Sequence, residues 1–227
     1  MSTQIIDLRA AAGPIGDQGS RGTCVAFALT AVHMAAIAET FELSEEYLFW
    51  AAKKRDGWLG DGTTYRAALS GLSEDGQCTA ALWPYHDGRS HVSANYSPPA
   101  DAVQDAQNRT GDGDREFFTV SDVRASLEAG VLIAVGIPVW DEFATTNGTD
   151  VLQLPSAIAT SPLEHAVVIV GHDADRSALL VRNSWGTGWA DEGHAWVDDA
   201  IIATAVIVDG WTIDRTDELL EAANGPG

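Results

Sequence analysis

Residues 17–27 read DQGSRGTCVAF and join a turn rich in Gly and Ser to an apolar run that continues to about residue 38. The run is too long for a strand and is rich in alanine, so it predicts a mostly buried helix over residues 24–38. Cys24 then stands at the first position of this helix, where the helix dipole favours a thiolate. The usual interpretation of an arbitrary cysteine is a small buried apolar residue, and we give Cys78 that interpretation.

The rest of the first half also carries helical patterns. Ser44 followed by two glutamates is typical of an N-cap with an acidic first turn, and it predicts a helix that continues to about residue 51. Another helix is expected from Thr64 to about residue 73. Residues 86–115 are dominated by His, Asp, Gly, Ser, Asn and Pro, which indicates a long surface loop or a crossing between two lobes.

The second half changes to strand patterns after a short helix, which is expected over residues 121–129 and stopped by Gly130. Short β-branched or aliphatic runs then alternate with Gly, Asp and Asn, which predicts strands. The expected strands cover residues 131–139, 166–170, 178–181, 195–197 and 201–208. The tail from Thr212 is expected to be frayed. Helices followed by strands indicate an α+β fold of two lobes, with a cleft at their seam.

The composition is that of a soluble globular protein, with 45% hydrophobic and 20% charged residues among 227. The chain holds 13 basic and 33 acidic residues, which gives a formal net charge of −20. Such a negative surface repels nucleic-acid phosphates and anionic lipids, so we expect no nucleic-acid partner and no membrane partner. The sequence starts without a signal-peptide pattern and its longest apolar run is about half a membrane span, which favours a cytoplasmic location.

Two later segments carry the residue types that a thiol nucleophile needs. Residues 164–171 read EHAVVIVG and place His165 at the start of an apolar strand. Residues 182–189 read RNSWGTGW and place Asn183 in a turn of Trp and Gly. A thiol nucleophile needs a base that takes its proton, and the base needs a hydrogen-bond acceptor that fixes its tautomer. Cys24, His165 and Asn183 can supply these three roles.

These segments resemble the papain-like cysteine peptidases of the peptidase C1 family. Residues 17–27 match the family's nucleophile segment, residues 164–167 match its histidine segment, and residues 183–189 match its asparagine segment. Weaker matches extend the resemblance over about residues 5–211. It implies an α+β, two-lobed papain-like fold with a helical N-terminal lobe, a β-barrel-like C-terminal lobe and the active site in the cleft between them.

The resemblance also implies a division of the chain. We expect a single papain-like catalytic domain over residues 1–211 and a C-terminal tail over residues 212–227. The helical lobe would take up about residues 10–115. The β-rich lobe would take up about residues 116–211 together with the N-terminal segment.

Carried over to this sequence, the family pattern makes Cys24 the nucleophile, His165 the general base and then general acid, and Asn183 the residue that orients the imidazole. Gln18 would donate its side-chain amide, together with the backbone N–H of Cys24, to the oxyanion of a tetrahedral intermediate. Trp185 would shield the bond between histidine and asparagine from water.

A substrate-binding strip is implied at Gly60, Asp61 and Gly62, which align with a Gly-rich segment that pairs with the substrate backbone. The resemblance places Trp185 beside it at the substrate cleft. We expect no cofactor and no metal site, because His86 and His91 lie in a polar loop without partners at metal-ligand spacing.

The sequence departs from the family at several positions. Arg21 stands where many relatives carry a cysteine and Gly60 where its disulfide partner would be, so that bridge is expected to be absent, which fits a reducing compartment. Thr23 and Val25, on either side of Cys24, also differ from the usual residues. The sequence starts where relatives begin after removal of their inhibitory propeptide, so we expect a bacterial-type variant without a propeptide.

The expected function is that of a cysteine peptidase, a thiol protease that hydrolyses peptide bonds through a Cys-His-Asn triad and a thioester acyl-enzyme. Its expected partners are a peptide or protein substrate and a separate inhibitor or regulator. Two alternatives stay open: an acyltransferase or amide-forming enzyme that passes the acyl group to an amine or thiol, and a catalytically inactive peptide-binding module.

Overall fold

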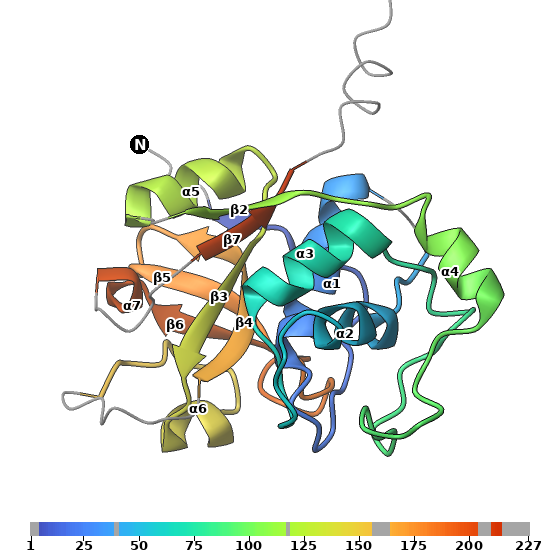
Figure 1. Cartoon of the computed structure of the whole chain (residues 1–227). Coiled ribbons are helices and arrows are strands. Elements are labelled where there is room, and N and C mark those ends of the chain that lie inside the picture. The colour runs from blue at the N-terminus through green and yellow to red at the C-terminus, as the bar shows by residue number, and fades with distance from the viewer. Residues whose placement is uncertain (1–4, 39–40, 117–118, 156–163, 204–209, 215–227) are drawn as a thin grey trace, which may run out of the picture.

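The structure is a computed structural model that describes residues 5–38, 41–116, 119–155, 164–203 and 210–214 (Figure 1). Helices α1 to α4 gather on one side of the molecule, and an antiparallel sheet forms the other side. The α+β class expected from the sequence is confirmed.

The three helices expected in the first half are confirmed with small changes of boundary. Helix α1 spans Cys24–Ile37, and its residues from Val25 to Ala36 are buried. Helix α2 spans Glu45–Lys53, and Ser44 caps it by accepting a hydrogen bond from the backbone N–H of Tyr47. Helix α3 spans Tyr65–Asp75, and Thr64 caps it in the same way. Side-chain oxygens at these caps satisfy amides that a helix leaves unpaired.

Of the two interpretations of residues 86–115, a long surface loop or a crossing between lobes, the uninterrupted loop is wrong in two places. Helix α4 spans Ala100–Ala106, and strand β2 spans Gly113–Glu116. Ala102 and Ala106 are fully buried in a small cluster with Tyr47, Cys78 and Trp83. Long-range packing therefore stabilises a helix that the polar composition does not suggest, and β2 exists because it pairs with β7.

The sheet contains most of the expected strands, with changed ends. Its order is β2-β7-β3-β4-β5-β6, and β1 pairs with β4 outside this path. The neighbouring strands are antiparallel. Their bounds are Ile6–Asp7 for β1, Ile133–Pro138 for β3, Glu164–Asp173 for β4, Ala178–Arg182 for β5, His194–Asp198 for β6 and Gly210–Ile213 for β7. Helix α5, Val120–Glu128, confirms the helix expected before Gly130.

Two predictions near the C-terminus need correction. Residues 201–203 belong to the short helix α7, Ala200–Ala203, and not to a strand, while residues 204–209 of the expected strand lie outside the described residues. Thr212 and Ile213 are ordered in β7, where they pair with β2 and are buried, so fraying does not begin at Thr212. The rest of the expected tail, residues 215–227, lies outside the described residues.

One apolar core joins the helices to the sheet. Leu29 of α1 and Leu72 of α3 belong to the same buried cluster as Ile133 of β3, Val168 of β4 and Leu180 of β5. Helix α1 packs on β3 and β4, so its N-terminal end lies near the start of β4. In the described part of the chain, no helix has the length and apolar character needed to cross a membrane.

Two more short helices complete the described elements. A 3-10 helix, η1, spans Arg9–Ala12 between β1 and the nucleophile segment, and helix α6 spans Asp141–Thr145 after β3. Phe143 of α6 is fully buried. Figure 1 shows α6 below the sheet. Phe143 packs against Trp185, which stacks on His165 at the start of β4.

Candidate active site

Cys24 is the first residue of α1 and is half-buried, with a free thiol. Burial raises the pKa of this thiol, and hydrogen bonding from the backbone N–H groups of Ala166 and Val25 opposes the rise. The pKa lowering expected from the helix terminus alone is therefore outweighed by desolvation. The contact with Ala166 places the sulfur beside the residue that follows His165.

His165 lies at the start of β4 and is 6% exposed. Its Nε2 atom is 2.7 Å from Oδ1 of Asn183. The same Oδ1 accepts a hydrogen bond from the backbone N–H of Ser184 at 2.7 Å, so this atom must be the amide oxygen. Nε2 of His165 is consequently the donor, and in the neutral imidazole Nδ1 carries no proton and can accept one.

Burial lowers the pKa of His165, against the hydrogen bond with Asn183, which raises it. Desolvation therefore disfavours the charged forms of both Cys24 and His165. A thiolate and an imidazolium in this site would have to stabilise each other. Their mutual attraction is strong where water is excluded.

Aromatic rings cover the histidine. Trp185 stacks on the imidazole of His165 with a centroid distance of 4.7 Å and an interplanar angle of 29°. Phe143 and Trp189 pack against Trp185, and the indole N–H of Trp189 donates to the carbonyl oxygen of Phe143 at 3.1 Å. A Trp face over the ring also attracts an imidazolium more than a neutral imidazole. The sequence pattern indicated Trp185 but not Phe143, which lies in a segment without a motif.

Gln18 connects the nucleophile segment to the asparagine segment. Its Oε1 accepts a hydrogen bond from the Ser184 hydroxyl at 2.6 Å, and its Nε2 donates to the carbonyl oxygen of Arg21 at 2.7 Å. The backbone N–H of Gln18 donates to the carbonyl oxygen of Ser184 at 2.9 Å. These bonds fix the side-chain amide at the loop before Cys24 and bring the segments of Gln18, Cys24, His165 and Asn183 together.

The strip Gly60, Asp61 and Gly62 lies against the nucleophile loop. Asp61 accepts a hydrogen bond from the backbone N–H of Gly22 at 3.0 Å. A Cβ atom on Gly22 would lie only 2.8 Å from the backbone nitrogen of Gly62, so only glycine fits there. The strip is thus held directly beside the loop that carries Cys24.

Lys53 organises the same strip from the end of α2. Its Nζ donates to the carbonyl oxygens of Trp58, Gly60 and Gly62 at 2.7, 3.2 and 3.1 Å, and to the Asp56 carboxylate at 2.9 Å. Sequence reasoning did not identify this residue, because a lysine on a helix is usually solvated. Its side chain is only 8% exposed.

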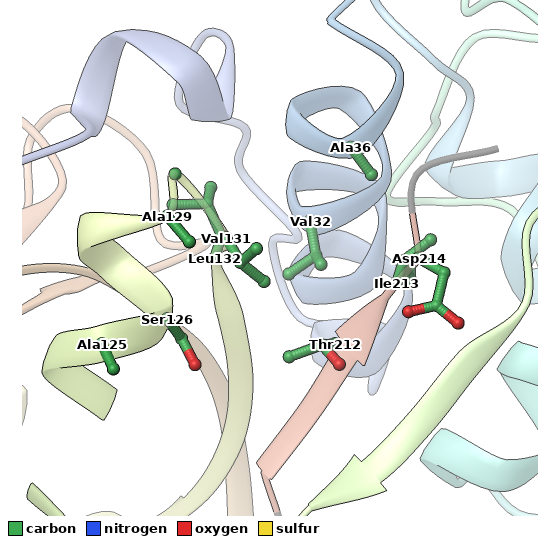
Figure 2. A pocket seen from close by; sticks show the side chains of 11 residues that line it. Val32, Ala36, Ala125, Ser126, Ala129, Val131, Leu132, Thr212, Ile213 and Asp214 are labelled. Atoms are coloured by element: carbon green, nitrogen blue, oxygen red, sulfur yellow. The ribbon is translucent and has the colours of Figure 1, made fainter. Parts of the chain in front are cut away.

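The apolar hollow shown in Figure 2 is separate from these residues. It measures about 370 Å³ and is lined by α1, α5 and β7. Its lining includes Val32 and Ala36 of α1. At the rise of an α-helix, these residues lie roughly 12 and 18 Å along the helix axis from Cys24. Among the described residues, no group of three or more His, Cys, Asp or Glu side chains is placed to hold a metal ion.

Comparison with known sequences supports one family. The family profile described as papain family cysteine protease matches residues 3–208. Digestive cysteine proteinase 2 of Homarus americanus is 27% identical over 82% of this chain and 58% of its own length. A peptidase C1-like protein of Acanthamoeba polyphaga mimivirus is 24% identical over 78% of this chain and 62% of its own length. The chain thus spans about three fifths of the length of these curated relatives.

Comparison with solved structures agrees. Xylellain, a cysteine protease from Xylella fastidiosa, superposes with a TM-score of 0.79 at 23% identity, over 93% of this chain and 86% of that one. The Carica candamarcensis cysteine protease CMS1MS2 in complex with E-64 superposes with a TM-score of 0.69 at 21% identity, over 95% of this chain and 100% of that one. With the profile match across the chain, these findings establish that the chain belongs to the papain family of cysteine proteases.

Proposed function

We propose that this chain hydrolyses peptide bonds as a cysteine peptidase, with Cys24 as nucleophile, His165 as general base and acid, and Asn183 as the residue that orients the imidazole. The observation that carries the proposal is the 2.7 Å bond between His165 Nε2 and Asn183 Oδ1 under Trp185. It fixes the tautomer in which Nδ1 of His165 carries no proton. The free thiol of Cys24, at the N-terminus of α1, contacts the backbone N–H of Ala166, the residue after His165.

In the first half of the reaction, Nδ1 of His165 takes the thiol proton of Cys24. The sulfur then attacks the peptide carbonyl carbon, and the carbonyl electron pair moves to oxygen. A side-chain N–H of Gln18 and the backbone N–H of Cys24 stabilise this oxyanion, because both are donors fixed before the charge forms. The peptide C–N bond then breaks, the imidazolium gives its proton to the leaving amine, and a thioester remains.

In the second half, water replaces the amine. His165 takes a proton from water, the resulting hydroxide attacks the thioester carbonyl, and a second oxyanion forms at the same donors. Collapse of this intermediate breaks the C–S bond and releases a carboxylic acid. The imidazolium returns its proton to sulfur, so the thiol and the imidazole are restored.

The site has features that suit a peptide substrate. Gly60, Asp61 and Gly62 present backbone beside the nucleophile loop, where an extended peptide can pair with main-chain groups. The net charge of −20 favours approach of basic peptides over acidic ones at low ionic strength. A separate inhibitor or regulator would restrain the activity.

The test is product analysis on a mixture of peptides, with and without an added primary amine. Hydrolysis predicts new carboxylic-acid termini in both samples, and inhibition by E-64, the compound bound in two of the structural neighbours. Products that carry the added amine in place of the acid would contradict hydrolysis and favour acyl transfer. A folded chain that neither turns over peptides nor reacts with iodoacetamide at Cys24 would contradict the catalytic assignment altogether.

A further inference from the structure

A buried ion pair lies directly beneath the nucleophile loop. Arg21, three residues before Cys24, is 6% exposed, and Glu46 of α2 is fully buried. The guanidinium of Arg21 pairs with the Glu46 carboxylate through two bonds, Nη1 to Oε2 at 2.8 Å and Nη2 to Oε1 at 3.0 Å. Two parallel bonds fix both the position and the plane of the arginine head.

Other groups complete the surroundings of this pair. The Glu46 carboxylate accepts further hydrogen bonds from the Tyr96 hydroxyl at 2.7 Å and from the backbone N–H of His86 at 3.2 Å. The guanidinium of Arg21 lies over the rings of Phe49 and Tyr85, 5.2 and 4.9 Å from their centroids. Arg89, whose side chain is 30% exposed, also lies 3.3 Å from Glu46 Oε2, so the buried carboxylate faces two guanidinium groups. Moving Arg21 away would leave its own buried charge unpaired.

The backbone of Arg21 is joined to one proposed oxyanion donor and to the residue that precedes the other. Its carbonyl oxygen accepts the side-chain Nε2 of Gln18 at 2.7 Å and the backbone N–H of Thr23, the residue before Cys24, at 2.9 Å. Tyr85 adds a second connection, since its hydroxyl donates to the carbonyl oxygen of Gln18 at 2.8 Å and lies 2.9 Å from the Thr23 hydroxyl. The carbonyl oxygen of Arg21 therefore holds the Nε2 side of the Gln18 amide, while the Ser184 hydroxyl holds its Oε1 side.

We propose that Arg21, held by Glu46, is a positioning residue for the oxyanion site and acts through the side-chain amide of Gln18. This inference rests on the proposed function, in which Gln18 stabilises the tetrahedral intermediate. In this chain the loop is held by a buried ion pair with α2, and the carbonyl oxygen of Arg21 orients the Gln18 amide.

The charge-free pair Arg21→Met with Glu46→Gln tests the proposal, because it removes the ion pair without leaving one buried charge alone. On a fluorogenic peptide amide we expect kcat to fall about tenfold to a hundredfold with KM within about twofold, since a displaced donor weakens only the transition state. In a Gln18→Ala background the same double change should lower kcat by no more than about threefold, because the group through which Arg21 acts is already gone.

Two further measurements separate positioning from a general loss of structure. Alkylation of Cys24 by iodoacetamide forms no oxyanion. In the double variant the rate constant of alkylation should therefore stay within about twofold of the parent chain at each pH. Arg55→Met is the matched control, because Arg55 also pairs with carboxylates between α2 and α3 but makes its bonds to Ala51, Glu74 and Asp75. Its kcat should not change.

Each outcome supports or overturns the inference. If the double variant does not fold, Arg21→Lys serves instead, since it keeps the charge but loses the two-bond pairing, and it should lose kcat in the same Gln18-dependent way. An equal loss of kcat with and without Gln18, or no loss in a folded variant, would overturn the positioning role alone. No loss of kcat in Gln18→Ala itself would overturn the assignment of Gln18 in the proposed function, and the role of Arg21 with it.

Discussion

Cys24 and Cys78 are the free cysteines of the chain, and burial raises the pKa of both thiols, to about 11 for Cys78. Cys78 is fully buried in an aromatic and alanine cluster, whereas Cys24 is half-buried at the start of a helix and faces the Ala166 N–H. Ala166, whose N–H contacts the Cys24 sulfur, follows His165, which bonds Asn183 and stacks on Trp185. Reactivity is thus expected from neighbouring groups and not from the thiol alone.

The largest expected effect is the loss of turnover in Cys24→Ala, with turnover kept in Cys78→Ala. The first change removes the proposed nucleophile and little core volume, while the second removes an inert core sulfur and costs stability through a small cavity. Peptidase assays on the two purified, folded variants check this. Substantial activity in Cys24→Ala, or loss of activity in a folded Cys78→Ala, would contradict the assignment of Cys24 as the nucleophile.

The next effect concerns the base. His165→Ala should lower kcat/KM by several powers of ten, because the general base and general acid vanish together. Asn183→Ala should lower it less, because the imidazole is loosened and not removed. Steady-state kinetics on both variants checks the order. A larger loss for Asn183→Ala than for His165→Ala would show that the asparagine does more than orient the ring.

The third prediction concerns the pH dependence of kcat/KM. The active state of the Cys24 and His165 pair carries one dissociable proton, so kcat/KM should follow a bell whose two midpoints belong to the pair. Burial lowers the pKa of His165, so the acid limb should lie below the ordinary histidine value of about 6.5. Burial raises the pKa of Cys24, so activity should fall again only at alkaline pH. A single rise near the pKa of a free thiol would contradict a coupled pair.

The smallest expected effect is on stability under reduction. The described structure holds both cysteines as free thiols, so a reducing agent should leave the melting temperature unchanged and should protect activity, because an accessible thiolate is oxidised readily. Differential scanning fluorimetry with and without reductant checks this. A lower melting temperature on reduction, or a disulfide between Cys24 and Cys78 found by mass spectrometry in active protein, would contradict it.

Local signals in the sequence predicted the elements that carry the site. The N-caps at Ser44 and Thr64 and the alanine-rich run after Cys24 predict α2, α3 and α1, because these helices begin with local hydrogen bonds. Helix α4 and the end of β7 depend on distant partners, Cys78 and Trp83 for one and β2 for the other. No local pattern records such contacts.

The candidate site shows the same division. Three separated motifs predicted Gln18, Cys24, His165 and Asn183, and the structure brings their segments together. Four contributing residues were not predicted as site residues: Glu46, Lys53, Tyr85 and Phe143. Glu46 and Tyr85 lie in segments that match the family only weakly, and all four act through long-range contacts. Only Glu46 carried a signal in the sequence. It is a charged residue directly before the apolar residues of a buried helix, which indicates a buried charge that needs a partner.

We expect Cys24 to form a covalent acyl intermediate during turnover. Mass spectrometry tests for this acyl-enzyme. The protein is mixed with an activated peptide ester and quenched in acid within the first turnover, and Cys78→Ala is treated in the same way as the control. We expect the mass of one acyl group on the peptide that contains Cys24 in the parent chain and in Cys78→Ala, and none in Cys24→Ala. An acyl group mapped to another residue, or turnover without any acyl-enzyme in a chain whose Cys24 reacts with iodoacetamide, would contradict it.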